Sequence, residues 1–163
     1  MKQPDFLVIG GGIIGVSVAR SLKKRFASAR VLVLEKERVL GVHSSGRNSG
    51  VLHAGFYYTA DSLKARFTRE GNLTLTAYCR EKGLPLNPCG KLVVARSAAD
   101  LPQLDELLAR GRRNGVPLES ISEREAVQIE PRVKTFERAL FSPSTATADP
   151  LRVLEAMRLD ALN

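Results

Sequence analysis

Short apolar runs and a longer amphipathic segment alternate along the first part of the chain. The run from Phe6 to Ile9 has the length of a strand, residues 16–22 predict a helix, and the run from Val31 to Leu34 predicts a second strand. A strand, a helix and a strand in this order form a βαβ unit, in which the two strands are parallel. The pattern therefore predicts an α/β fold.

A glycine-rich turn joins the first predicted strand to the helix. Residues 10–15 read Gly-Gly-Gly-Ile-Ile-Gly, and the βαβ context turns a weak GxGxxG match into a strong one. Gly10 permits the tight turn, Gly12 lets a pyrophosphate approach the backbone, and Gly15 lets helix and strand pack closely. This part of the chain is predicted to be a Rossmann-like dinucleotide-binding unit.

Further dinucleotide contacts are predicted at the start of the helix and after the second strand. The helix N-terminus, at Ile13 and Ile14, offers unpaired N–H groups and a positive dipole to phosphates. Glu35 lies 25 residues after Gly10, where an acid accepts hydrogen bonds from ribose hydroxyls, and the adjacent Lys36 is assigned to the same site. Because an acid here disfavours a 2′-phosphate, NADP is not expected.

After Glu35 the chain enters a polar loop, where a nicotinamide-binding domain would continue with a short helix and a third strand. Small residues and hydroxyls let backbone amides reach an extended ligand, and Arg47 offers a planar fork of donors to a phosphate. A solvated surface loop is the alternative interpretation, and the glycine-studded, aromatic continuation argues against it. The predicted binding residues of this loop are Ser44, Ser45, Arg47, Asn48, Ser49 and Gly50.

The turn at residues 10–15 and the segment SSGRNSGVLHAGFYY at residues 44–58 resemble a known family. They are similar to the FAD-dependent oxidoreductases of the D-amino-acid oxidase and glycine oxidase superfamily, and within it to the L-2-hydroxyglutarate oxidase/dehydrogenase branch. The resemblance implies FAD as cofactor. It continues over nearly the whole chain, through residues 62–66, 78–83, 89–95 and 114–117.

The resemblance also implies a domain organisation. Residues 1–83 would belong to the FAD-binding part, residues 84–141 to an α+β substrate domain, and residues 142–163 to a return segment and helix. Members of the family are more than twice as long as these 163 residues. No strand follows the helical run at 150–159, so we expect a truncated fold that is inactive alone and self-associates through uncovered apolar surface.

The activity implied by the resemblance is the FAD-dependent oxidation of a 2-hydroxy acid such as L-2-hydroxyglutarate to the 2-oxo acid. His53 is the predicted base, because an imidazole titrates near neutral pH. A histidine that packs on the flavin or binds a backbone carbonyl is the alternative. A flavoenzyme that oxidises an amino acid or glycerol phosphate and a non-catalytic FAD-binding remnant stay open as functions, and oxygen and a quinone stay open as electron acceptors.

Composition adds a basic charge to this interpretation. The formal net charge is +8, with 44% hydrophobic and 26% charged residues, as in a soluble globular protein. Lys and Arg are dispersed and no nucleic-acid-reading motif accompanies them, so no nucleic-acid partner is expected. Two cysteines and two histidines lack the spacing of a metal site. We expect a cytoplasmic protein without a bound metal, and peripheral attachment to the inner membrane stays open.

The remainder of the chain predicts further helices and strands. Asp61 is the expected N-cap of a long helix that Gly83 closes. The spacing of Ser122 and Glu125 predicts a capping box for a short helix that ends near Ile129. The other predicted elements are a helix from Leu101 that fades by Gly115, and strands at residues 90–95 and 139–141.

Overall fold

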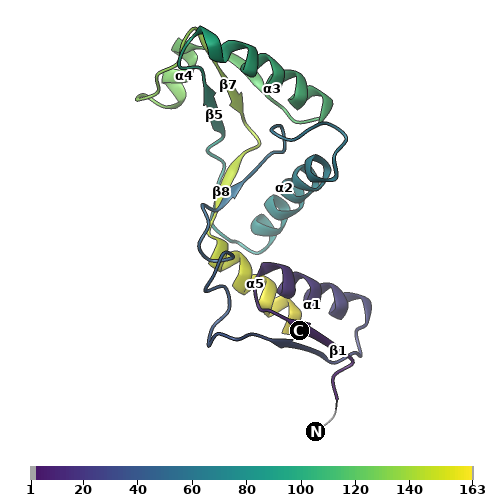
Figure 1. Ribbon diagram of the computed structural model, residues 1–163. Helices are drawn as coiled ribbons and strands as arrows, with labels where there is room; N and C mark the ends of the chain where they lie inside the picture. The colour runs from purple at the N-terminus through teal and green to yellow at the C-terminus, as the bar shows by residue number, and fades with distance from the viewer. Residues whose placement is uncertain (1–2, 163) are drawn as a thin grey trace. The chain divides into compact units, whose positions relative to one another are not determined.

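The computed structural model describes residues 3–162, and the chain divides into two compact units. Met1–Gly50, Lys82–Pro85 and Ala148–Asn163 form the first unit, whereas Val51–Glu81 and Leu86–Thr147 form the second (Figure 1). These two units are defined by the contacts between residues. The domains predicted from the family resemblance, residues 1–83, 84–141 and 142–163, are defined by function instead, and they stay a prediction.

The first unit contains the predicted βαβ segment. Strands β1 (Phe6–Ile9) and β2 (Val31–Leu34) pair in parallel, and α1 (Ile13–Arg25) connects them. Both strands have the predicted bounds. The helix extends beyond residues 16–22 at both ends, because the glycine turn leads directly into it and the basic residues of its last turn complement the helix dipole.

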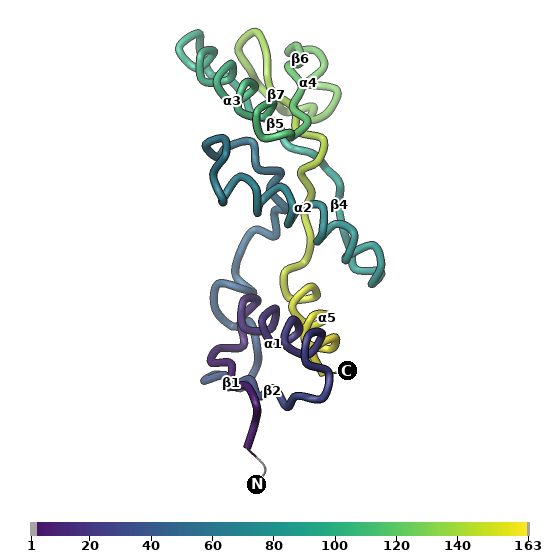
Figure 2. Tube along the Cα trace, turned by 90° about the vertical axis from the view of Figure 1, so that its right-hand side faces the viewer, coloured from purple at the N-terminus to yellow at the C-terminus, as the bar shows by residue number. Residues whose placement is uncertain are grey.

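The last helix of the chain belongs to the same unit. Helix α5 (Pro150–Leu162) packs beside α1 (Figure 2). Arg20 Nε of α1 lies 3.0 Å from Asp160 Oδ2 of α5, and the Ser17 hydroxyl donates to the Met157 sulfur at 3.7 Å. These contacts tie the two ends of the described chain into one unit.

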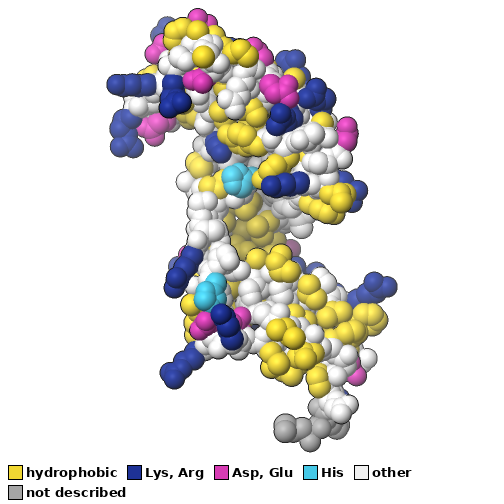
Figure 3. Space-filling view, in the orientation of Figure 1, with side chains coloured by type: hydrophobic (Ala, Val, Ile, Leu, Met, Phe, Trp, Pro, Cys, Tyr) yellow, Lys and Arg dark blue, Asp and Glu magenta, His cyan; other side chains and the backbone are white. Residues whose placement is uncertain are grey.

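The two-stranded sheet of the first unit is covered on one face. Successive residues of a strand point to opposite faces, and the strands alternate between half-buried and exposed positions. The half-buried set includes Val8, which approaches α1 at Gly15. The other face exposes apolar side chains, and Figure 3 shows hydrophobic side chains at the surface of this unit. The exposed residues are Leu7, Ile9, Leu32 and Leu34.

The second unit contains two antiparallel sheets of three strands, in the orders β5–β7–β6 and β3–β8–β4. Its strands are β3 (Val51–Leu52), β4 (Leu86–Asn87), β5 (Lys91–Val94), β6 (Glu119–Ser122), β7 (Arg138–Ser142) and β8 (Ala146–Ala148), of which β8 reaches the first unit at Ala148. Its helices are α2 (Leu63–Glu81), the 3-10 turn η1 (Ala98–Asp100), α3 (Leu101–Arg113) and α4 (Glu123–Ile129).

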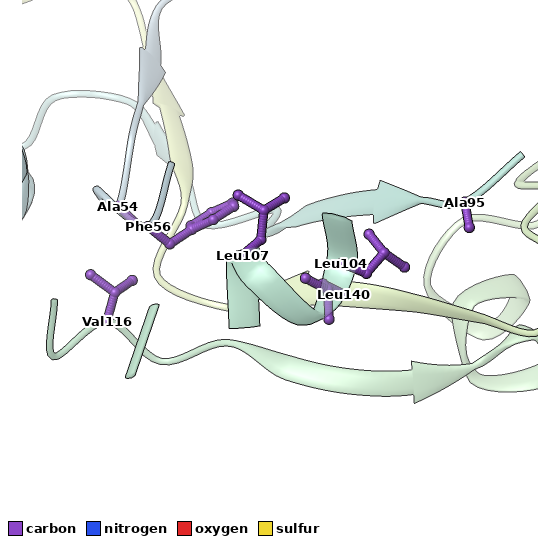
Figure 4. Close-up of a cluster of buried hydrophobic side chains, with 7 residues drawn as sticks. All are labelled: Ala54, Phe56, Ala95, Leu104, Leu107, Val116 and Leu140. Carbon is purple, nitrogen blue, oxygen red and sulfur yellow. The ribbon is translucent and has the colours of Figure 1, made fainter. Parts of the chain in front are cut away.

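The core of the second unit lies between α3 and the central strand β7. Leu104 and Leu107 of α3 belong to one buried cluster with Phe56 and with Leu140 of β7, which has no exposed surface (Figure 4). A second, smaller cluster lies under α4, around Ile121, Ala126 and Ala139. The leucines at 101–108 therefore form core, as their spacing predicts.

The helix ends of the second unit test the capping predictions. The Ser122–Glu125 capping box is confirmed: Ser122 Oγ accepts from the Glu125 amide at 3.3 Å, and Glu125 Oε2 accepts from the Ser122 amide at 2.7 Å. The N-cap predicted at Asp61 is wrong. Ser62 Oγ accepts from the Ala65 amide at 3.1 Å, while Asp61 adopts left-handed backbone with φ 61°.

Candidate functional site

The turn after β1 is built around two glycines. Gly10 has φ +103°, a conformation that side chains disfavour, and its amide donates to the Leu34 carbonyl at 2.7 Å. A Cβ atom at Gly15 would collide with the Gly10 carbonyl oxygen. The close packing predicted for Gly15 is therefore present, and it brings the start of α1 against the end of β1.

Backbone amides at the start of α1 bind oxygen atoms of side chains from later in the chain. The Gly11 amide donates to Glu35 Oε2 at 2.7 Å, and the Ile13 amide donates to Ser45 Oγ at 3.0 Å. A Cβ atom at Gly12 would lie 2.9 Å from the same Ser45 oxygen. The turn is thus shaped to receive oxygen acceptors at amides near a helix N-terminus, as pyrophosphate binding requires.

Glu35 follows β2 and uses both carboxylate oxygens. Oε2 accepts from the Gly11 amide, and Oε1 accepts from the Glu37 amide at 3.1 Å. The Gly11 amide, followed by the Glu37 amide, holds the pKa of Glu35 below its ordinary value. The ionised carboxylate has further lone pairs, which can accept hydrogen bonds from ribose hydroxyls.

The loop after Glu35 is folded on Asn48. Its side-chain nitrogen donates to the carbonyls of Ser44 at 3.0 Å and Ser45 at 3.1 Å, and its Oδ1 accepts from the Gly50 amide at 2.9 Å. Asn48 therefore shapes the loop that places the Ser45 hydroxyl. The hydrogen bonds of the Asn48 side chain thus lie within the loop itself.

The predicted dinucleotide residues fall into two groups. The structure brings Ile13, Glu35 and Ser45 together around the glycine turn. Within residues 3–162, five exposed side chains of the set make no hydrogen bond or ion pair to Ile13, Glu35 or Ser45, although the Lys36 backbone amide is hydrogen-bonded to the Glu35 carboxylate; they are Ile14, Lys36, Ser44, Arg47 and Ser49. Gly11 was not among the predicted contacts, although its place in the triple glycine was the available signal.

His53 lies in the second unit, directly after β3, on the loop that leads to Phe56. Its side chain is exposed by surface area, yet surrounding atoms crowd the ring enough to lower its pKa, and the charge of Lys91 lowers it further. The imidazole is therefore neutral at neutral pH, the form that accepts a proton. Lys91 was missed from the sequence because it is 38 residues away.

Residues 3–162, the described part of the chain, lack the features of a metal site and of a membrane-spanning helix. It contains no group of three or more His, Cys, Asp or Glu side chains placed to hold a metal ion. No helix in it combines the length and the apolar character needed to cross a bilayer.

The chain is similar in sequence to known proteins. Mitochondrial L-2-hydroxyglutarate dehydrogenase of Homo sapiens is 41% identical over 146 residues, which are 89% of this chain and 31% of that protein. L-2-hydroxyglutarate dehydrogenase of Escherichia coli (strain K12) is 40% identical over 153 residues, 94% of this chain and 36% of that protein. The chain thus spans about a third of the length of these curated relatives.

Solved structures and a family model extend the similarity to the fold. Dithionite-reduced L-alpha-glycerophosphate oxidase from Mycoplasma pneumoniae with FAD bound is 28% identical, with a TM-score of 0.88 over 99% of this chain and 43% of that chain. The family model described as FAD dependent oxidoreductase matches residues 5–163. The fold and nearly the whole length of the chain match this family, so the chain belongs to the FAD dependent oxidoreductases.

Proposed function

We propose that this chain is the FAD-binding N-terminal part of an enzyme that oxidises a 2-hydroxy acid of the L-2-hydroxyglutarate type to the 2-oxo acid. The observation that carries the cofactor assignment is the pair of amides at Gly11 and Ile13, which point out of the glycine turn and donate to oxygen atoms of Glu35 and Ser45. The relatives at 40–41% identity support the substrate class.

The residues of the first unit have separate tasks in this proposal. When bound, FAD would supply the flavin that takes up the hydride of the substrate, and the residues of this unit would hold it. The glycine turn at the start of α1 would hold the pyrophosphate, and Glu35 would accept hydrogen bonds from the ribose hydroxyls with the lone pairs that the Gly11 and Glu37 amides leave free. Ser45 Oγ accepts a hydrogen bond from the Ile13 amide, and this bond would hold the loop after Glu35 beside the nucleotide.

His53 is the proposed base. The substrate must lose its hydroxyl proton as the carbon–hydrogen bond breaks, and a neutral imidazole accepts that proton. The lowered pKa of His53 supports this role because it keeps the ring unprotonated in a neutral solution. The 2-oxo acid then leaves as the product, and the protonated His53 imidazole releases its proton to solvent.

Competitive titration tests the cofactor assignment. Purified protein should bind FAD in preference to NAD, measured by the change in flavin fluorescence as either dinucleotide is added. Turnover assays of a longer protein with the same motif, with L-2-hydroxyglutarate against glycine, then separate a hydroxy-acid oxidase from an amino-acid oxidase. NAD binding without flavin binding contradicts the proposal, and FAD binding without any turnover favours a non-catalytic remnant.

Substitution of the candidate base tests the mechanism in that longer protein. His53→Ala should lower the rate of flavin reduction per bound FAD by about a hundredfold, the usual contribution of a positioned base. His43→Ala is the matched control, because this second histidine contacts Glu37 at 2.8 Å in the first unit. A normal rate per bound flavin in His53→Ala, together with reduced FAD content, would assign His53 to flavin packing instead.

A further inference from the structure

A cavity of about 300 Å³ lies in the second unit, where α2 begins and α3 ends. Three arginines belong to its lining, Arg66 and Arg69 from α2 and Arg113 from the last position of α3. Arg66 and Arg69 are three residues apart on one helix, a spacing that places their side chains on the same face. The cavity is therefore lined by guanidinium groups from two helices.

Arg69 is held in place by a hydrogen bond to the end of the other helix. Its Nη1 donates to the carbonyl of Asn114, the residue after α3, at 3.1 Å. A Cβ atom at Gly115 would lie 2.8 Å from the same Nη1, so the glycine leaves room for the guanidinium. This bond uses one part of the planar fork and leaves the other N–H donors of Arg69 for a ligand.

The arginines of the cavity are weakly neutralised. Arg69 is half-buried, and it forms no ion pair with a carboxylate of residues 3–162. Arg66 Nε lies 3.5 Å from Glu70 in an exposed pair, and Arg113 Nη2 lies 3.7 Å from Glu106. Exposed pairs of this kind contribute little, so neither carboxylate commits its arginine.

Asp61 is the one acid among the lining residues that the structure describes. No ion pair within residues 3–162 joins it to an arginine. Three positive charges and one negative charge thus line one small volume. This excess of positive charge favours an anion in the cavity.

Asn114 connects the cavity to the loop that carries His53. It belongs to the lining, and only 8% of its surface is exposed. Its side-chain nitrogen donates to the carbonyls of Gly55 at 3.0 Å and Tyr58 at 2.9 Å. A ligand bound to Arg69 would therefore lie beside the residue that anchors this loop.

We propose that this cavity binds a small oxyanion with two negative charges, a phosphate or a dicarboxylate, through the guanidinium groups of Arg66, Arg69 and Arg113. Arginine suits both anions, because its planar fork of donors matches the oxygen atoms of a carboxylate and of a phosphate. The inference goes beyond the proposed function, since the lining contains none of the residues proposed for FAD binding or proton transfer.

Isothermal titration of the 163-residue chain with inorganic phosphate and with succinate, at neutral pH and low salt, tests this site. Saturable binding of at least one of them is expected, and the tighter of the two identifies the ligand as a phosphate or a dicarboxylate. Acetate is the control for charge, and acetate binding as tight as that of succinate or phosphate would contradict a site for two charges. Absence of saturable binding of both dianions would overturn the inference.

Substitution of Arg69 tests whether the cavity is the binding site. In Arg69→Gln the affinity for the tighter anion should fall roughly tenfold or more, because charge-assisted hydrogen bonds are lost. Arg80→Gln is the matched control, since Arg80 also lies on α2 and forms no ion pair within residues 3–162, but does not line the cavity. Unchanged affinity in Arg69→Gln, or equal losses in both variants, would overturn the inference.

Asp61→Asn provides a second test with the opposite sign. Asp61 has left-handed backbone, which asparagine also tolerates. Removal of this negative charge should raise the affinity for the anion about threefold. A gain of affinity does not arise from misfolding, so this variant decides the matter even if Arg69→Gln fails to fold. Unchanged or lower affinity in Asp61→Asn would contradict the site.

FAD titration of Arg69→Gln separates this inference from the proposed function. The variant should bind FAD as the unchanged chain does, because Arg69 belongs to the second unit and the glycine turn to the first. A parallel loss of FAD and anion affinity would overturn the inference by assigning the arginine to the cofactor. Failure of the unchanged chain to bind FAD would contradict the proposed function, while anion binding that depends on Arg69 would still support this site.

Discussion

The two units complete their sheets in different ways. In the second unit, the central strand β7 lies between β5 and β6, and α3 covers it so completely that Leu140 has no exposed surface. In the first unit, α1 covers one face of β1 and β2, while the other face leaves Ile9 83% exposed. Parallel strands are ordinarily buried on both faces, so the first unit has a face that further protein would cover.

The difference shows which part of the chain has its own core. The second unit buries aromatic and aliphatic side chains around Phe56 and Leu140, and this cluster supports the loop of the candidate base. The first unit concentrates its buried residues along α1, at Val16 and Ala19, and near α5. The proposed nucleotide site therefore lies on the less enclosed of the two units.

Truncation of the second unit's core should have the largest effect. Leu140→Ala removes a fully buried side chain that contacts α3, and should lower the free energy of unfolding by about 2–5 kcal/mol. Urea unfolding followed by circular dichroism measures this loss. An effect below about 1 kcal/mol would mean that the second unit has no more of a core than the first.

Removal of the charge at Glu35 should weaken the nucleotide site of the first unit. Glu35→Gln keeps the size of the side chain but weakens its bonds to the ribose and to the Gly11 amide, and FAD affinity should fall roughly tenfold to a hundredfold. For the unchanged chain, affinity should decline as the pH falls through the lowered pKa of Glu35, below the ordinary 4.5.

Isothermal titration with FAD measures both effects. Glu37→Gln is the control, because Glu37 contributes its backbone amide to Glu35 and its own carboxylate binds His43. Equal FAD affinity for Glu35→Gln and the unchanged chain would show that the ribose is held by other groups.

The sequence predicted those parts of the molecule that depend on local patterns. The strands at Phe6–Ile9 and Val31–Leu34 and the Ser122–Glu125 box follow from periodicity and spacing alone. Strand β6 was missed because only Ile121 of its four residues is buried, which leaves almost no alternation to detect.

Contacts between distant residues could not be predicted from local patterns. Glu35 was predicted as a ribose contact, but its bond to the Gly11 amide, across a separation of 24 residues, was not. The approach of Lys91 to Tyr57 depends on the strand pairing of the second unit. Asp61 and Ser62 are both residue types that cap helices. In the loop before α2, Asp61 adopts left-handed backbone, and the Ser62 hydroxyl accepts from the Ala65 amide instead.

Loss of the capping box should have a moderate effect on the second unit. Ser122→Ala removes the acceptor for the Glu125 amide and should lower the free energy of unfolding by about 1 kcal/mol. Thermal unfolding measures the change, and Ser120→Ala on the same strand is the control. If the two variants unfold alike, the cap does not contribute to the stability of α4.

Substitution on the uncovered face of the first unit should have the smallest effect on folding. Ile9→Lys should change the free energy of unfolding by no more than about 0.5 kcal/mol, because Ile9 is already exposed. We expect the unchanged chain to self-associate through this face and the lysine variant to do so less, as sedimentation velocity would measure. Unfolding of the first unit by Ile9→Lys would mean that the face is buried.

The attachment of the His53 loop to α3 has a consequence for its motion. Asn114 follows the last residue of α3, and its amide holds the Gly55 and Tyr58 carbonyls. The loop can open only when these bonds break, so its amide protons should exchange with deuterium together with those of the last turn of α3. Residues 53–58 and the end of a helix some fifty residues later would then behave as one cooperative opening unit.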